Sequence, residues 1–310
     1  MSPVLYALLS AVLFGASTPF AKRMVGQVDP LLLAGLLYLS SGISLTAFRV
    51  FRDRGWRASG LNGGEGKWLL VAIGAGGVAA PVLLMTGLTF TSGAQASLLL
   101  NLEAVLTALI AWLVFHENAD RRIVLGMCAI VAGGVLLSWA PQPTASQGWA
   151  GPLLVALATL CWAIDNNLTR RVSGADAVYV ASVKGLTAGT LNTGLALALS
   201  PQVPSPEATA AVFLVGALGF GASLVFFVLA LRGLGTARTG AYYAVAPFVG
   251  AALSLLVLGE PASPQFWIAT GFMAIGVWLH MTEVHDHWHW HGSLRHRHPH
   301  YPDSEHRHRH

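Results

Sequence analysis

Residues 8–23, LLSAVLFGASTPFAKR, and residues 156–171, ALATLCWAIDNNLTRR, are two versions of one pattern. In both, an apolar run carries an aromatic residue, Phe14 or Trp162, and reaches a pair of basic residues eight positions further on. The second version begins near the midpoint of the chain, which has 310 residues. This spacing indicates that the chain consists of two similar halves.

A second match supports the repeat. Residues 102–117, LEAVLTALIAWLVFHE, align with residues 245–260, VAPFVGAALSLLVLGE, so that Glu117 coincides with Glu260. The offset between the copies is slightly shorter here than in the first match, so the halves differ by a few residues in loop length.

The composition places these halves in a membrane. Hydrophobic residues make up 54% of the chain and charged residues only 10%, whereas a soluble domain carries about 25% charge. A spanning helix needs about 20 apolar residues. Ten segments meet this requirement: 3–21, 31–50, 68–88, 93–115, 122–140, 150–168, 178–200, 208–231, 237–258 and 264–282. We therefore predict an all-α membrane protein, with one five-helix repeat in residues 1–140 and another in 148–282.

The distribution of Lys and Arg predicts the orientation, because these residues stay in cytoplasmic loops. With the N-terminus inside, 15 of the 18 basic residues fall on the cytoplasmic side, and Lys22 and Arg23 fall on the other. The remaining one, Lys184, lies within a span. This asymmetry predicts a multi-pass protein of the cell inner membrane with both termini in the cytoplasm.

An odd number of helices per repeat has a further consequence. The second copy must cross the membrane in the opposite sense to the first, which makes the halves inverted repeats. Such repeats are typical of secondary transporters, whose halves expose a central site to alternate sides. Gene duplication also builds membrane proteins that transport nothing, and this alternative stays open.

The repeated motifs resemble the ten-helix EamA-type transporters of the drug/metabolite transporter superfamily. The resemblance covers residues 3–282 and includes the aromatic-to-basic spacing, the acidic residue at a helix exit, and the glycines Gly133 and Gly276 in the helix that follows. It implies export or exchange of a small metabolite, an amino-acid-like compound or a drug without ATP. The family pattern also places a proline about thirteen residues before the exit Glu. Pro247 fits, whereas Ala104 takes this place in the first copy, where a kink is therefore in doubt.

Glu103 is an ionisable residue near the centre of the fourth predicted span. Such residues are costly in a membrane and usually face the bundle interior with a partner. Thr107 lies one turn further on the same face, whereas Asn101 lies about 200° away around the helix. We consider Glu103 and Asn101 candidate binding residues. Glu103 would bind a proton, another cation or a substrate amine; the alternative is a structural carboxyl that is paired or protonated.

Asp165 and Lys184 enter the membrane from the same side to similar depths, so we expect a buried ion pair between them. The pair is either structural, since loss of one partner leaves a buried charge uncompensated, or part of a gate. Asn166 lies beside it and is a further candidate for contact with substrate or with another helix. In a proton-coupled cycle, Glu103 would be the carrier carboxyl and Lys184 would tune its charge.

Residues 283–310 differ in character from the rest of the chain, because they hold ten of the twelve histidines. We expect a disordered cytoplasmic tail. Neutral imidazole binds zinc, copper and nickel, so the tail is a candidate zinc or nickel site. Its candidate ligands are His285, His287, His289, His291, His296 and His298. The alternative is a solvated tail that binds metal only adventitiously.

The sequence carries no HExxH, GxSxG or glycine-rich phosphate loop, so no enzyme is predicted, and no cofactor is required. The expected partners are a small-molecule substrate and the lipid bilayer, without nucleic acid; a homodimer is left open. The competing function is a membrane metal sensor or regulatory protein that acts through the tail.

Overall fold

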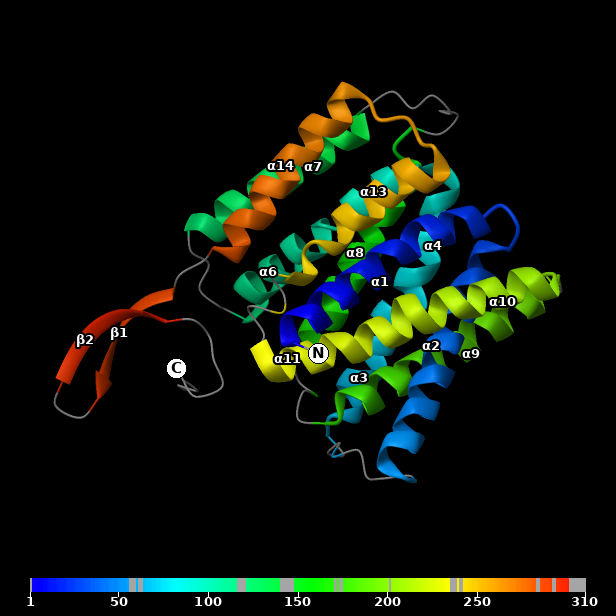
Figure 1. Cartoon of the computed structure of the whole chain (residues 1–310), viewed down its shortest axis with the longest axis horizontal. Helices are drawn as coiled ribbons and strands as arrows, with labels where there is room; N and C mark the ends of the chain where they lie inside the picture. Colours follow the sequence, from blue (N-terminus) through cyan, green and yellow to red (C-terminus); the bar gives the residue numbers. More distant parts are fainter. Residues whose placement is uncertain are drawn as a thin grey trace.

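The computed structural model describes residues 2–55, 60, 64–115, 121–139, 148–169, 172, 175–200, 202–234, 239, 242–282, 285–291 and 294–300. Up to Thr282 it is a bundle of helices (Figure 1). The elements are α1 (Pro3–Met24), α2 (Pro30–Asp53), α3 (Gly66–Ala72), η1 (Ile73–Ala79), α4 (Ala80–Phe90), α5 (Gly93–Leu99), α6 (Leu102–Phe115), α7 (Arg121–Trp139), α8 (Ala150–Thr169), α9 (Ala177–Leu199), α10 (Pro206–Val215), η3 (Gly216–Ala222), α11 (Ser223–Leu234), α13 (Ala246–Leu258) and α14 (Pro264–Met281).

Each of the ten predicted spans contains one of these helices or a consecutive series of them. Within the described residues, six stretches are long and apolar enough to cross a membrane by length and composition. Large apolar side chains, such as Leu153 on α8 and Leu256 on α13, are exposed on the outside of the bundle. An apolar exterior of this kind is typical of a surface that contacts lipid. The chain is therefore an all-α, multi-pass membrane protein.

Local sequence explains where several helices begin. Four of them start at a Ser-Pro or Asp-Pro pair, in which the first residue caps the helix and the proline occupies its first turn. The pairs begin at Ser2, Asp29, Ser205 and Ser263. At α2, for example, the Asp29 carboxylate accepts hydrogen bonds from the backbone N–H of Leu31 and Leu32 at 2.9 and 3.1 Å. These caps fix the ends of the helices at the loops that the sequence indicated.

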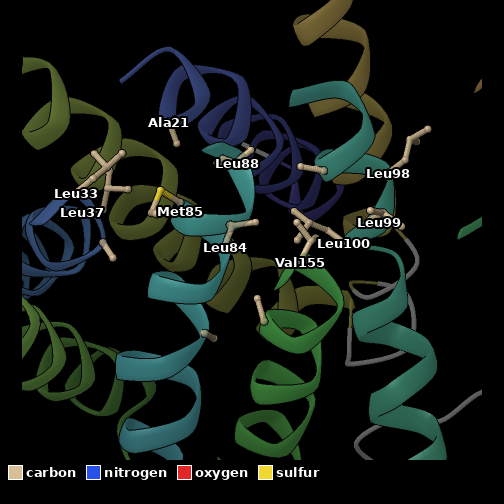
Figure 2. Close-up of a cluster of buried hydrophobic side chains, with 14 of the residues drawn as sticks. Ala21, Leu33, Leu37, Leu84, Met85, Leu88, Leu98, Leu99, Leu100 and Val155 are labelled. Atoms are coloured by element: carbon tan, nitrogen blue, oxygen red, sulfur yellow. The ribbon is translucent and has the colours of Figure 1, made fainter. Parts of the chain in front are cut away.

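The core lies where α1, α2, α4, α5 and α8 meet. Figure 2 shows its buried leucines: Leu33 and Leu37 come from α2, whereas Leu84 and Leu88 come from α4. Val155 of α8 closes the same cluster. Because α8 belongs to the second predicted repeat and the other four helices to the first, this core joins the two halves.

Close helix contacts at glycine also join the halves. α7 and α14 lie side by side along one flank (Figure 1), where a Cβ at Gly133 would lie 2.8 Å from Met273 Cγ and one at Gly276 would lie 2.6 Å from Ile130 Cγ1. α2 and α9 form the second such pair. There, a Cβ at Gly185 would lie 2.8 Å from the Cα of Gly42. Small residues at these positions let the backbones approach, which is how transmembrane helices gain packing energy.

An ion-pair cluster joins the C-terminal end of α2 to the N-terminal end of α9. Arg52 Nη2 lies 2.6 Å from Asp176 Oδ2, and the Arg49 guanidinium lies 5.0 Å from the centre of the Tyr179 ring. Asp176 also caps α9 through the N–H groups of Val178 and Tyr179. Burial opposes its ionisation, but these hydrogen bonds and that of Arg52 hold the pKa of Asp176 below its usual value.

Disorder of the C-terminal tail as a whole stays a prediction. In its described part, His285–His291 (β1) and Leu294–His300 (β2) pair as an antiparallel hairpin that projects from the bundle (Figure 1). The physical reason is the alternation of His and Trp in β1, because a period of two and aromatic residues both favour a strand. Residues 301–310 lie outside the described part of the chain.

The α2–α9 contact generates a stability prediction. We expect Gly185→Ala to lower the free energy of unfolding by about 1–3 kcal/mol, because its new methyl group would meet the backbone atoms Gly42 Cα and Tyr38 O at 2.8 and 2.9 Å. Thermal unfolding in detergent measures this effect. Gly194→Ala is the control on the same helix, because nothing lies within 4 Å of its added Cβ. Equal melting temperatures of the two variants would contradict this packing.

Candidate functional site

The fourth span of the first repeat is interrupted beside Glu103. α5 ends at Leu99 and α6 begins at Leu102, although the apolar pattern predicts one continuous helix over 93–115. Asn101 stabilises the break, because its side-chain Nδ2 donates to the Leu98 carbonyl at 2.9 Å. An interruption therefore lies near the position where a kink was in doubt for lack of a proline, and an asparagine side chain bonds to the backbone there.

The second repeat is interrupted at the corresponding point. Residues 244 and 245 form a turn and α13 begins at Ala246. The alignment that matches Glu117 with Glu260 also matches Glu103 with Ala246. Broken helices at matching positions of two repeats are the arrangement in which transporters place substrate and ion sites. Pro247 lies in the first turn of α13, where the family pattern expects it.

Glu103 lies in the first turn of α6 and is partly exposed. The N-terminus of a helix carries partial positive charge and so favours a carboxylate there. Its Oε1 accepts a hydrogen bond at 2.8 Å from Asn166 Nδ2 on α8. The neighbouring Asn167 donates to the Thr107 carbonyl at 3.2 Å and so fixes α8 against α6. A carboxylate of the first repeat is thus held by an amide of the second.

Asp165 and Lys184 form the predicted ion pair. Lys184 Nζ donates to both Asp165 oxygens at 2.5 and 2.6 Å, and the Thr169 hydroxyl donates to Oδ1 at 2.8 Å. The two side chains are largely buried, with exposed fractions of 7% for Asp165 and 17% for Lys184. Both charges are close enough to act electrostatically on Glu103. The three ionisable residues therefore belong to one site.

A row of aromatic side chains lies beside these charges. Phe220 contacts Tyr38 and Phe14, with ring centroids 5.6 and 5.8 Å apart. Phe14 in turn lies 5.6 Å from Tyr243, which lies 4.9 Å from Phe227. The row therefore combines α1 and α2 of the first repeat with η3, α11 and a helical residue just before the turn at 244–245 of the second. Tyr38 and Tyr243 lie within electrostatic range of Glu103.

Two π-helical segments, η1 and η3, lie next to this row. The alignment that matches Glu117 with Glu260 also matches their first residues, Ile73 and Gly216, so the segments occupy equivalent places in the third helix of each repeat. π-Helical segments of this kind occur frequently at functional sites.

The backbone of η1 is tied directly to the site. The Gly76 carbonyl accepts hydrogen bonds from the Tyr38 hydroxyl and from Trp162 Nε1, both at 3.0 Å. A side chain at Gly76 would collide with the Asp165 carboxylate. Glycine at this position therefore lets the irregular helix lie against the ion pair.

Another contact between the halves lies at the opposite end of α13 from the break. The Glu260 carboxylate accepts hydrogen bonds from the N–H groups of Gly93 and Ala94 at 2.7 and 2.8 Å, at the N-terminus of α5. Lys22 Nζ donates to the Leu88 carbonyl at 2.5 Å and lies within electrostatic range of Glu260. The acidic residue at the helix exit of one repeat thus caps the fourth helix of the other. Glu117, its counterpart, lies outside the described residues.

The structure brings together four of the five predicted binding residues: Glu103, Asn166, Asp165 and Lys184. It separates the fifth, because Asn101 is buried and its Nδ2 approaches Met273 Sδ on α14 at 4.0 Å. Among the described side chains no group of three metal-ligating residues occurs. The side chains of the predicted metal ligands in the tail lie outside that description.

Sequence reasoning missed Tyr38, Tyr243 and Phe220. A signal was present in the glycines of the third helix of each repeat, because Gly76 and Gly219 occupy equivalent positions when Glu117 is aligned with Glu260. Glycine interruptions at matching positions of two halves point to a binding site in transporters.

The bundle and the charged site between its halves define a membrane transporter. A family model, the EamA-like transporter family, matches residues 1–139 and again 149–282, and the chain belongs to this family. It is 27% identical over 286 residues to an uncharacterized transporter of Methanothermobacter thermautotrophicus, covering 87% of this chain and 83% of that protein. It is also 24% identical to the uncharacterized inner membrane transporter YedA of Escherichia coli, covering 89% of each chain.

One solved structure, described as a crystal structure of a protein, has the same fold. It aligns with a TM-score of 0.65 and 20% sequence identity, covering 89% of this chain and 95% of that one.

The buried ion pair yields a second prediction. Lys184→Met should destabilise the protein by about 3–5 kcal/mol, because it leaves the Asp165 carboxylate without its cation. The double variant Asp165→Asn/Lys184→Met should recover a large part of the loss, because it removes both charges. Thermal unfolding in detergent measures both. A double variant no more stable than Lys184→Met would contradict charge pairing as the main contribution.

Proposed function

We propose that this protein is a secondary active transporter that exports a small metabolite, an amino-acid-like compound or a drug across the inner membrane, with both termini in the cytoplasm. The observation that carries the proposal is the contact of Glu103 with Asn166. It joins the broken fourth helix of one repeat to α8 of the other, at a carboxylate that is still partly exposed.

Alternating access is supported by the kinds of contact between the halves. Glycine contacts along α2–α9 and α7–α14 bring helices of the two repeats together along their length, and we infer that the repeats move against each other at these contacts. The Glu260 and Lys22 side chains add hydrogen bonds that join α13 and α1 to the α4–α5 corner. Such polar contacts can break and form again as the halves move. From the distribution of basic residues we infer that this corner lies on the outer side of the membrane.

Proton coupling through Glu103 is supported by its surroundings. The groups that act on this carboxylate are Asp165 on α8, Lys184 on α9, Tyr38 on α2 and Tyr243 before α13. Since Lys184 is hydrogen-bonded to Asp165, the pair brings little net charge. Glu103 is then the carboxylate that can gain a proton or a cation in one state and release it in another.

The third prediction tests this role in proteoliposomes that contain a pH-sensitive dye. Mixtures of small metabolites, amino acids and drugs are added under an imposed pH gradient. The wild type should then couple proton movement to solute movement. Glu103→Gln should abolish this coupling. Glu207→Gln is the matched control, because Glu207 is exposed in the first turn of α10. Unchanged coupling in Glu103→Gln would rule out Glu103 as the proton carrier.

A second candidate function, metal binding by the tail, is favoured by the register of the hairpin. The strands place His285 opposite His300, His287 opposite His298 and His289 opposite His296. Antiparallel partners lie about 4.5–5.5 Å apart, so this register brings several imidazole-bearing positions together. Zinc or nickel is the metal that such ligands bind.

The fourth prediction separates this candidate from transport. Calorimetric titration of the full-length protein with zinc should give a dissociation constant well below about 1 mM, and a chain that ends at Thr282 should lose this binding. Solute flux should survive the truncation. A zinc affinity no tighter than millimolar in the full chain would remove the metal function. Absence of flux for any ligand in the full-length protein, together with metal-dependent binding of a partner, would favour a sensor over a transporter.

A further inference from the structure

We propose that the Glu103 site takes an organic amine without a carboxylate: a monocation with one flat aromatic or apolar body. This inference rests on the proposed transport function and narrows its substrate class. It excludes zwitterionic amino acids as the preferred cargo.

The first argument is the negative charge of Glu103, which has no positively charged partner among the described residues. Lys184 donates to both oxygens of Asp165 and lies 3.4 Å from the Thr169 hydroxyl. Among the described residues, Asn166 is the one donor that reaches the Glu103 carboxylate, and it is neutral. Counted over the residues that the structure describes, the ionised site therefore carries one uncompensated negative charge. A single positive charge on the ligand would compensate it.

The second argument concerns what the site lacks for an amino acid. A substrate carboxylate needs a cation or an array of hydrogen-bond donors, because its burial without partners is costly. Within the part of the chain that the structure describes, the cation that acts on Glu103 is Lys184, which is already committed to Asp165. A bound amino acid would have to break that ion pair, whereas an amine would not.

The third argument is the aromatic row. Tyr38, Phe220, Phe14 and Tyr243 follow one another with ring centroids 5.6 to 5.8 Å apart. All four side chains are partly exposed, although Phe14, Tyr38 and Phe220 also pack against buried clusters. Aromatic faces attract cations and stack on flat apolar groups. A carboxylate next to such faces is the combination that recognises an organic ammonium ion.

The experiment compares three ligands that share a phenyl ring on a short alkyl chain and differ in their charged groups. Phenethylamine carries an ammonium group, 3-phenylpropionate a carboxylate, and phenylalanine both. Calorimetric titration of the purified full-length protein should show phenethylamine binding at least about tenfold more tightly than phenylalanine. Binding of 3-phenylpropionate should be undetectable. Glu103→Gln should weaken phenethylamine binding about tenfold or more, whereas Glu207→Gln should leave it unchanged.

The aromatic contribution is tested at Tyr243. Tyr243→Leu should weaken phenethylamine binding several-fold, and Tyr243→Phe, which keeps the ring, should retain it. Melting temperatures show that each variant is folded. Equal or tighter binding of phenylalanine, no detectable binding of the amine, or amine binding that is insensitive to Glu103 would overturn the inference.

The outcomes also separate this inference from the proposed function. Glu103-dependent, proton-coupled flux of phenylalanine without amine binding would overturn the amine inference and leave transport standing. Amine binding with the expected charge preference, but without coupled flux, would support the inference and count against proton-coupled transport.

Discussion

The structure depends on the requirement that backbone polar groups inside a membrane find partners within the protein. An unsatisfied N–H or C=O costs several kcal/mol in hydrocarbon, so a spanning helix can be interrupted only where something replaces its lost hydrogen bonds. At the α5–α6 break, the Asn101 side chain adds a hydrogen bond to the Leu98 carbonyl, which also accepts one from the Asn101 backbone N–H. At η1, the Tyr38 hydroxyl and Trp162 Nε1 donate to the Gly76 carbonyl. Tyr38, an aromatic residue of the site, therefore also stabilises the irregular backbone beside it.

Repeat symmetry explains why these interruptions lie together. One constant offset relates η1 to η3, the break before α6 to the break before α13, and Glu117 to Glu260. The two repeats nevertheless differ at the positions of the two carboxylates, Glu103 and Asp165. The position of Glu103 is occupied by Ala246 in the second copy, whereas Asp165 aligns with Ser17 in the first. Each half thus contributes one carboxylate to a shared site, and only the second half contributes a lysine to neutralise its own.

The sequence predicted the features that depend on composition and on distance along a helix. Apolar length was sufficient to predict an all-α membrane protein, six of whose stretches are long and apolar enough to span a membrane among the described residues. Depth below the membrane boundary was sufficient to predict the Asp165–Lys184 pair. The break after Leu99 could not be predicted, because its cause is a side-chain bond from Asn101 that hydrophobicity does not register. Tyr38 and Tyr243 were missed for a related reason: an aromatic residue in an apolar run looks the same whether it faces lipid or a site. In residues 285–291, His occupies every second position. We interpreted this alternation as a metal-ligand pattern, although a period of two is also typical of a strand.

The Asp165–Lys184 pair also limits what the site can do. A lysine free to bind would make the site suitable for zwitterions, because it would attract a carboxylate while Glu103 attracts an amine. By holding Lys184 with both oxygens, Asp165 removes that option. Asp165 is itself held by Thr169 and lies against Gly76, where a larger residue would displace it. The small residue in η1 therefore permits the ion pair, and the ion pair leaves Glu103 as the charge that a ligand meets. Gly76 therefore links the π-helical backbone of η1 to the packing of the ion pair and, through it, to the substrate preference proposed above.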